Sequence, residues 1–467
     1  MSALAMCERE LLIFAAFWFV LGLADELAID LAWLWLRATG RASTQRLPQG
    51  YGRDPLSGPL AVLIPAYREA GVIATTIAHA LDAWPQRDLR LYVGCYANDA
   101  ATLAAAMEGA GCDPRVRLVV HGARGPTTKA DCLNRLYRAL CDDEARNAMR
   151  FRGVLLQDAE DMVHPAALQA IDAALGAVDF VQLPVRPAIQ PQARWIGGHY
   201  ADEFTESHAK ALVVRNALGA PLPAAGVGCG FARGALQRLA ERRGDEASHG
   251  PFSPECLTED YELGIELSRE GRGSAFLRLR DADGALVATG SYFPATLDAA
   301  VRQKTRWVHG IAFQSWDRQG WTSRPVELWM AIRDRRGPLT ALVLCAAYLL
   351  LAIDAVLMIA ERGFGYHAVL PLSAPVKAMV AISFAGFIWR AVSRAAFTAR
   401  EYGPAEGVLA VLRIPVGNVI AIMAGRRALV AYLRSLAGAR VVWDKTEHAA
   451  HPASAHAAAL PLRRVNA

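Results

Sequence analysis

The chain has 467 residues, 53% of them hydrophobic, and a formal net charge of +5. Its length allows two or three domains, and its hydrophobic fraction is high for a purely soluble protein and indicates membrane segments. The arginines cluster beside apolar runs, which favours a membrane surface over nucleic acid as the partner. The eight cysteines show neither a Cys-x-x-Cys pair nor zinc spacing, a pattern typical of reduced thiols in the cytosol.

The first apolar segment, residues 11–36, is long enough to cross a bilayer, which takes about 20 residues. Asp25, Glu26 and Asp30 interrupt it, and acids inside a membrane usually face protein or water. Two interpretations stay open: a span over residues 11–24 that continues as an interfacial helix, or one long helix with its acidic side turned inward. Arginines follow the segment and only Arg9 precedes it, so the next domain is predicted to be cytoplasmic.

Four strand–helix units follow a linker rich in Pro and Gly, and this order is typical of a parallel α/β sheet. Each predicted strand runs into polar residues, and the carboxyl ends of such strands are where open α/β sheets bind ligands. The predicted strands cover residues 60–65, 89–96, 116–120 and 153–156, and the polar residues that follow them include Tyr67, Glu69, Asp99, Lys129 and Asp158. No glycine triplet or P-loop spacing is present, which argues against a dinucleotide or P-loop site.

The acidic turn after the fourth strand, Asp158, Glu160 and Asp161, is the most informative stretch. Three carboxylates within four positions repel one another unless a cation or a proton neutralises them. Hard oxygen ligands suit Mg²⁺ or Mn²⁺, and these ions share their coordination with substrate phosphates. The alternative is a solvated strand-to-helix turn in which Asp161 or a neighbour caps the next helix.

The second half of this domain is less regular. Residues 180–185 are predicted to form a strand, and residues 226–231 a small-residue turn that either lets backbone approach a ligand or is a simple tight turn. A helix is predicted to begin with Thr258 as its N-cap, which places Asp260 near a helix N-terminus where the dipole favours an ionised carboxylate. Residues 301–307 are basic with one aromatic, a composition compatible with an amphipathic helix at a membrane surface.

The membrane segments return towards the C-terminus. Residues 339–360 are a clear span, and residues 368–389 a second one weakened by two prolines and a lysine. Residues 407–424 lie between two basic clusters, so interfacial or re-entrant helices are preferred there over a span. The Ala- and His-rich tail from Thr446 is predicted to be disordered.

Taken in order, these motifs resemble those of family 2 glycosyltransferases, whose membrane-embedded members include cellulose, chitin and hyaluronan synthases and ceramide glucosyltransferase. The stretches that carry the resemblance are Pro65 to Glu69, the Asp99 turn, Lys129 with Leu133 and Asn134, Asp158-Ala159-Glu160, Thr258-Glu259-Asp260, and Gln303-Lys304-Thr305-Arg306-Trp307. Two later stretches, at residues 413–418 and 443–448, resemble one subgroup of the family.

The resemblance implies an α/β fold, with a GT-A-type nucleotide-sugar-binding domain inserted between transmembrane α-helices. The implied organisation is a transmembrane or interfacial helix over residues 1–47, a cytoplasmic glycosyltransferase domain over 59–326, membrane and interfacial helices over 327–445, and the tail over 446–467.

The resemblance also implies residue roles. Tyr67, Glu69 and Asp99 would hold the base and ribose of a UDP-type donor, and Lys129 would meet the nucleotide or its phosphates. Asp158 and Glu160 would bind the nucleotide and a divalent Mg or Mn ion, with Glu160 standing where the family has Asp. Asp260 would be the general base. The residues implied at the diphosphate and the acceptor are Gln303, Arg306, Trp307, Glu259, Gly228, Cys229 and Gly230.

The implied function is that of an inverting glycosyltransferase in the bacterial inner membrane. It would transfer a sugar from a nucleotide-diphosphate donor to a growing polysaccharide or a lipid acceptor, in contact with membrane lipids. The alternative is a non-catalytic membrane scaffold that binds partner proteins of an envelope, exopolysaccharide-secretion or phage-adsorption complex. Acids kept at three separate strand or helix ends favour the enzyme.

Overall fold

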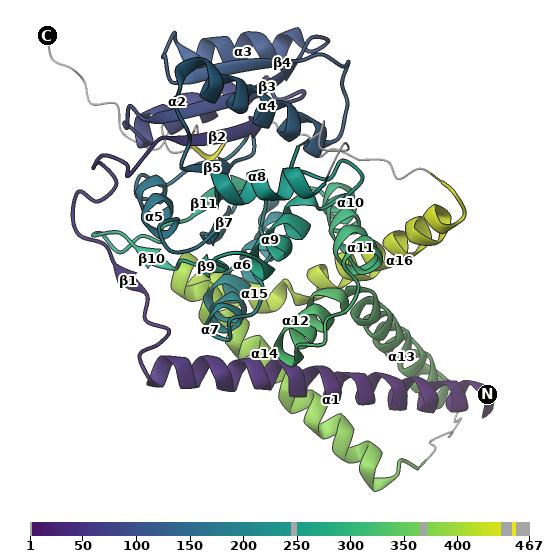
Figure 1. Cartoon of the computed structure of the whole chain (residues 1–467). Coiled ribbons are helices and arrows are strands. Elements are labelled where there is room, and N and C mark those ends of the chain that lie inside the picture. Colours follow the sequence, from purple (N-terminus) through teal and green to yellow (C-terminus); the bar gives the residue numbers. More distant parts are fainter. Residues whose placement is uncertain (1, 244–249, 365–370, 440–450, 454–467) are drawn as a thin grey trace, which may run out of the picture.

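The computed structural model describes residues 2–243, 250–364, 371–439 and 451–453. Its main body is a seven-stranded mixed sheet with strand order β4-β3-β2-β5-β8-β6-β9 (Figure 1). These strands are β2 (Leu60–Pro65), β3 (Leu89–Tyr96), β4 (Val116–His121), β5 (Gly153–Leu156), β6 (Phe180–Gln182), β8 (Cys229–Ala232) and β9 (Ser274–Phe276).

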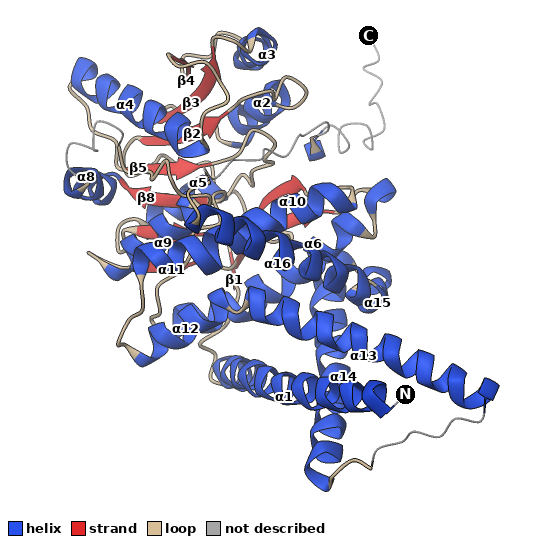
Figure 2. Cartoon of the chain, turned by 90° about the vertical axis from the view of Figure 1, so that its right-hand side faces the viewer, coloured by secondary structure: helices blue, strands red, loops and turns tan. Residues whose placement is uncertain are grey.

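The first half of the sheet is parallel and buried on both faces. β2, β3 and β5 are almost wholly inaccessible, which explains why these strands are continuous apolar runs instead of alternating ones. Figure 2 shows α4 and α8 on one face of the sheet and α2 and α3 on the other. The helices of this half are α2 (Ile73–Ala83), α3 (Ala100–Ala110), α4 (Lys129–Asn147), α5 (Ala167–Ala174) and α8 (Arg233–Arg242).

The second half of the sheet departs from the simple repeat. β8 is antiparallel and lies between β5 and β6. The single strand predicted over residues 180–185 divides before Pro184, so that β6 stays in the main sheet and β7 (Val185–Ala188) pairs with β11 (Thr289–Tyr292). A further two-stranded sheet joins β1 (Gln45–Arg46) to β10 (Leu279–Arg280). The mixed α/β domain between apolar helices confirms the predicted fold class.

A layer of helices separates this sheet from the long apolar helices (Figure 1). It comprises η1 (Pro191–Ala193), α6 (Ile196–Glu206), η2 (Ser207–Ala211), α7 (Leu212–Ala217), α9 (Glu259–Arg269), α10 (Leu297–Val308), η4 (His309–Gln314), α11 (Ser315–Gln319) and α12 (Pro325–Arg335). The boundary predicted between residues 326 and 327 falls inside α12. η2 and η4 are π-helical turns, which are rare and often mark functional sites.

Four helices in the described residues are long and apolar enough to cross a membrane: α1 (Ser2–Ala38), α13 (Gly337–Phe364), α14 (Ala374–Tyr402) and α16 (Ile414–Leu436). α1 is one continuous helix, which agrees with the second of the two interpretations of its acids. Residues 407–424 divide at Arg413 between α15 (Pro404–Leu412) and α16.

The predicted disordered tail lies mostly outside the described residues. Residues 451–453 are placed, and the His451 Nε2 atom is hydrogen-bonded to the backbone oxygen of Asp161 at 3.1 Å. His451 is buried there.

Candidate active site

A cavity of about 560 Å³ opens at the carboxyl ends of β2, β3 and β5 and continues into the helical layer. Tyr67 and Glu69 follow β2 and line it, together with Tyr96 at the end of β3. The rings of Tyr67 and Tyr96 meet edge to face, 5.1 Å apart. This end of the cavity therefore offers aromatic surface beside a buried carboxyl group, Glu69.

Asp99 does not line the cavity; it supports the loop that does. Its carboxylate accepts from the backbone N–H of Arg68 at 2.5 Å and, as the N-cap of α3, from that of Thr102 at 3.3 Å. Arg68 has a left-handed backbone, with φ of 54°, so the loop that presents Tyr67 and Glu69 is held in an unusual conformation. Asp99 thus contacts the predicted donor-binding loop through backbone groups.

Lys129 is the first residue of α4, after the Thr128 N-cap and its capping box. Its Nζ atom lies 2.6 Å from Asp158 Oδ1 and joins the polar ends of two strand–helix units. Burial alone would lower the pKa of Lys129, but the carboxylates of Asp158, Glu259 and Asp260 raise it well above its usual value. Lys129 therefore faces three acids that favour its charged form.

The acidic turn divides its carboxylates between two tasks. Asp158 and Glu160 line the cavity, whereas Asp161 is turned inward and its Oδ2 accepts from the backbone N–H of Asp158 at 2.7 Å. Thr76 adds a hydrogen bond to the backbone oxygen of Ala159 at 2.5 Å. Burial, followed by the charges of Asp158 and Glu160, raises the pKa of Asp161 well above its usual value. Asp161 is thus a structural cap of the turn that holds the other two acids.

The chemistry of this turn fits a divalent metal. Asp158 and Glu160 are hard oxygen donors crowded by a third carboxyl group, and a cation would relieve their mutual repulsion. Among the residues described, no group of three or more His, Cys, Asp or Glu side chains is arranged to enclose an ion. Two carboxylates at an open cavity suit Mg²⁺ or Mn²⁺, because these ions commonly complete their coordination with substrate phosphates and water.

Asp260 lies in the first turn of α9 and faces Gly226 from the loop before β8. A Cβ atom at Gly226 would stand 2.3 Å from Asp260 Oδ2, so the backbone approaches the carboxylate closely. Asp260 Oδ1 accepts from the backbone N–H of Tyr261 at 2.8 Å. Thr258 is the N-cap as predicted, but its side chain makes no capping hydrogen bond.

Burial is the largest influence on the ionisation of Asp260. Burial raises its pKa, and Asp158 adds to the effect, while Lys129, the Tyr261 amide and Arg306 oppose it. Burial, and then Asp260, raise the pKa of Glu259 to about 7. A carboxylate with a raised pKa is a stronger base than an exposed one, which suits proton abstraction near neutral pH.

Gln303, Arg306 and Trp307 all line the cavity from one face of α10, as their i, i+3, i+4 spacing requires. Trp307 packs edge to face on Tyr200, with ring centroids 6.0 Å apart. The Oε1 atom of Gln303 is buried without a hydrogen-bond partner in the described part of the chain. α10 therefore presents a cation, an amide and an indole to the same space as Asp260.

Gly228, Cys229 and Gly230 are not brought to the cavity wall. Cys229 and Gly230 belong to β8 in the middle of the sheet, and a Cβ at Gly228 would meet Thr289 Oγ1 at 2.6 Å. The small residues instead allow close packing inside the sheet, because β8 runs antiparallel between two other strands. The cavity is lined by Pro223, Ala224 and Ala225 just before them.

The half of the cavity nearer the apolar helices was not anticipated from the sequence. Its lining residues combine charge with apolar surface and come from α6, η2, α7, η4, α12 and the junction between α12 and α13: Glu203, Phe204, Ser207, His208, Ala211, Leu212, Arg215, Ile311, Met330, Arg333, Asp334 and Arg336. The polar residues Glu203, Ser207 and Arg215 are four and eight positions apart and so share one helix face, which is an available signal in the sequence. Such a pattern is equally typical of a solvated helix face.

Known proteins are similar to this chain over much of its length. The family described as "Glycosyltransferase like family 2" matches residues 58–310. The chain is 34% identical over 460 residues to the bacteriophage adsorption protein B of Escherichia coli K12, and to the bacteriophage N4 adsorption protein B of Escherichia coli O157:H7. In both cases 93% of this chain is aligned, and it spans 61% of the relative's length.

Among solved structures, a mannosyltransferase from Pyrobaculum calidifontis in complex with GDP-Man and Mn²⁺ is similar, at 18% identity and a TM-score of 0.46. The likeness covers 90% of this chain and 98% of that one.

Proposed function

The chain belongs to glycosyltransferase-like family 2, and we propose that it is an inverting glycosyltransferase of the bacterial inner membrane. Its donor would be a nucleotide-diphosphate sugar, and we propose a UDP-sugar. Its acceptor would be a growing polysaccharide or a lipid. One observation carries the proposal. A single cavity collects the Lys129–Asp158 pair, the carboxylate of Asp260 and the Gln303–Trp307 face of α10.

The donor is assigned to the end of the cavity at the sheet. Tyr67 and Glu69 would hold the nucleoside, and Lys129 would face the diphosphate. Asp158 and Glu160 would hold the divalent ion, which neutralises charge on the phosphates. Arg306 adds a second cation on the opposite wall, so that the negative charge developing on the leaving diphosphate meets positive side chains.

The acceptor is assigned to the half of the cavity lined by the helical layer. Asp260 lies between the two halves and would take the proton from an acceptor hydroxyl. The hydroxyl oxygen then bonds to the anomeric carbon while the bond from that carbon to the diphosphate breaks, and the electron pair leaves with the diphosphate. A single displacement with one base inverts the anomeric configuration.

The test is Asp260→Asn, with Asp298→Asn as a matched control at an exposed carboxylate in α10. Asparagine keeps the size of the side chain but removes the base. Loss of a general base typically lowers the rate about a hundredfold to ten-thousandfold. We expect Asp260→Asn to bind UDP in membranes at least as tightly as the wild type and to transfer sugar at least about a hundredfold more slowly from a panel of UDP- and GDP-sugars. Transfer at the wild-type rate would remove Asp260 from the mechanism.

The names of the relatives favour a second candidate, a non-catalytic part of an envelope or phage-adsorption assembly. The same variants separate the two. Full rescue of the cellular phenotype by a variant shown to be inactive would favour the scaffold, and loss of the phenotype together with transfer would favour the enzyme.

A further inference from the structure

α12 connects the catalytic cavity to the first membrane helix, because neighbouring residues at its end face opposite ways. Asp334 is directed towards the catalytic domain. Arg333, together with Arg336 one residue beyond α12, is directed towards α1. All three side chains also line the membrane-proximal half of the cavity.

On the catalytic side, Asp334 holds the turn that carries the base. Its Oδ2 atom accepts from the hydroxyl of Tyr261 at 2.7 Å, and Tyr261 directly follows Asp260 in α9. Arg215 donates from Nη1 to both oxygens of Asp334, at 2.7 and 2.9 Å, and from Nε to the backbone oxygen of Pro221 at 2.5 Å. The loop that starts at Pro221 leads to Gly226, which touches Asp260 from its other side. Asp334 and Arg215 therefore contact both segments that enclose the base.

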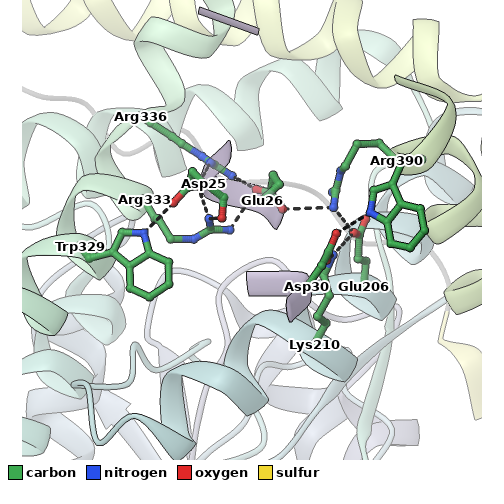
Figure 3. A network of polar contacts seen from close by, with 10 residues as sticks. Asp25, Glu26, Asp30, Glu206, Lys210, Trp329, Arg333, Arg336 and Arg390 are labelled. Atoms are coloured by element: carbon green, nitrogen blue, oxygen red, sulfur yellow. Dashed lines mark hydrogen bonds and ion pairs between the residues drawn. The ribbon is translucent and has the colours of Figure 1, made fainter. Parts of the chain in front are cut away.

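On the membrane side, the acids of α1 are paired with cations of the catalytic domain and of α14 (Figure 3). Asp25 accepts from Arg333, from Arg336 at 2.5 Å and from the indole of Trp329 at 2.6 Å. Glu26 accepts from Arg333 at 3.0 Å.

The same helix continues the network towards η2. Asp30 pairs with Lys210, which also reaches Glu206 at 2.7 Å. Arg390 of α14 lies 2.7 Å from Glu206 and 3.1 Å from Glu26, as the right side of Figure 3 shows. The network contains as many acids as cations, so each cation has an acid as its partner. These ion pairs hold α1 in one position along the helices it contacts.

Apolar packing seals the same junction. Ile29 and Leu36 of α1 form a small buried cluster with Val214 of α7, Ala220 and Met330 of α12. α1 therefore buries one side against the catalytic domain, although much of its remaining surface is apolar and exposed. A helix that only anchors the protein in the membrane would not need to pack one side against another domain.

We propose that Asp334 is a positioning residue for the base Asp260, and that α1, by holding α12 through Asp25 and Arg333, is a structural part of the catalytic centre. The inference rests on the proposed function, because it assigns Asp260 the role of base. Asp334 acts through Tyr261 and Arg215 and does not itself accept the proton.

The experiment compares Tyr261→Phe and Asp334→Asn in full-length protein, with Tyr432→Phe as the matched control. The hydroxyl of Tyr432 also donates to an aspartate, Asp317, at 3.0 Å, but on the outer side of α11 and away from α9. Hydrogen bonds to charged groups are strong enough to change a rate about tenfold to a hundredfold. We expect kcat to fall by that factor in Tyr261→Phe and Asp334→Asn, with UDP affinity within about twofold of wild type, and no change in Tyr432→Phe.

Two further variants test the contribution of α1. Asp25→Asn is expected to lower kcat in the same way, whereas Glu10→Gln, an exposed acid on the same helix, should not. The double variant Tyr261→Phe/Asp334→Asn should be no slower than the slower single one, because both changes remove the same contact.

The outcomes are separable. Wild-type kcat in Tyr261→Phe overturns the inference while leaving the proposed function intact. A joint fall of kcat, UDP affinity and thermal stability also overturns it, because that pattern means general unfolding. If the wild-type protein transfers sugar from no donor in the panel, the proposed function fails first.

Discussion

At the scale of single residues, the site is a charge balance organised around Lys129. This cation faces Asp158 on one side and the Glu259–Asp260 pair on the other. Each of these acids raises the pKa of Lys129. A donor diphosphate that enters the cavity would compete with these carboxylates for the same ammonium group. A divalent ion on Asp158 and Glu160 would offset that competition, which is the physical reason to expect donor and metal to bind together.

In the acidic turn, the proposed metal ligands Asp158 and Glu160 can be tested separately from the cap, Asp161. Asp158→Ala or Glu160→Ala should abolish transfer and weaken Mn²⁺-dependent UDP binding with little loss of stability. Asp161→Ala should affect metal dependence less, yet it removes the acceptor of the partly buried Asp158 amide and should lower the free energy of unfolding by about 1–3 kcal/mol. Calorimetric UDP binding and thermal unfolding of the detergent-solubilised protein measure both quantities. If Asp161→Ala alone removes the Mn²⁺ dependence, the assignment of the two ligands is wrong.

A comparison of two glycines tests the close approach of backbone to Asp260. Gly226 and Gly219 both have a left-handed φ, +76° and +67°, so alanine at either position costs about 1–2 kcal/mol. Only at Gly226 would the new Cβ collide with Asp260 Oδ2, whereas around Gly219 the space is open. Gly226→Ala should therefore lower kcat by at least about tenfold, and Gly219→Ala should leave it unchanged at a similar stability. Equal transfer rates in the two variants would show that the contact does not position the carboxylate.

At the scale of elements, the break between α15 and α16 is held by one buried arginine. Arg413 is fully buried and pairs with Asp202 of α6 at 2.7 Å and with Glu406 of α15 at 2.6 Å. It therefore joins the last helices to the helical layer that lines the cavity. The sequence shows an arginine and a proline inside an apolar run, which predicts an interruption but not the partner that the arginine finds.

Arg413→Ala should be strongly destabilising, because it leaves the buried carboxylate of Asp202 without its paired cation, while Glu406 keeps Arg194. Breaking a buried pair typically costs about 3–5 kcal/mol. Arg427→Ala in α16 is the control: its pair with Asp298 is longer, 3.5 Å, and exposed, so the expected loss is at most about 1 kcal/mol. Thermal unfolding of the purified protein in one detergent compares the two. A loss of the same size in both would mean that Arg413 is not a structural tie.

The elements also show which parts of the site the sequence could predict. β2, β3 and β5 were predictable because a strand buried on both faces must be continuously apolar, and their polar ends then meet at one edge of the sheet. The position of β8 was not, because nothing in residues 226–231 says that the chain returns antiparallel inside the sheet. For that reason Gly228, Cys229 and Gly230 were expected at the cavity.

The partners of Asp260 illustrate the same limit at longer range. Asp334 is 119 positions from Arg215 and 73 from Tyr261, and no local pattern links them. The sequence did indicate that the acids of α1 must face protein or water, because their burial in lipid is costly. Which cations meet them depends on how α12 and α14 pack, and only the structure supplies that.

At the scale of the whole molecule, contacts at the ends of the long helices show which helix ends lie on the same side of the membrane as the sheet. Glu401 at the end of α14 binds Arg278 at 2.7 Å and Arg280 at 2.5 Å in and beside β10. α16 lies along α10 and η4, with the ring of Tyr432 stacked on Phe313 at 4.6 Å. α16 is thus apolar and long enough to span, yet besides α13 it packs on α10 and η4 of the helical layer. Contacts of this kind favour a helix that lies at the membrane interface.

Cysteine labelling in intact cells decides between a spanning and an interfacial α16. We expect the catalytic domain and the end of α16 to be cytoplasmic, and the connection between α13 and α14 to be outside the cell membrane. Cys112, an exposed native thiol after α3, reports the domain, Ala439→Cys reports the end of α16, and Ser373→Cys reports the connection. Each is tested as the only exposed thiol of the chain.

A maleimide that does not cross the membrane should label Ser373→Cys in cells whose outer membrane is permeabilised. Cys112 and Ala439→Cys should react only after lysis. Labelling of Ala439→Cys before lysis would make α16 a true span and place residues 437–439 on the opposite side from the sheet. Labelling of Cys112 before lysis would overturn the orientation as a whole, and with it the supply of a cytoplasmic nucleotide sugar to the cavity.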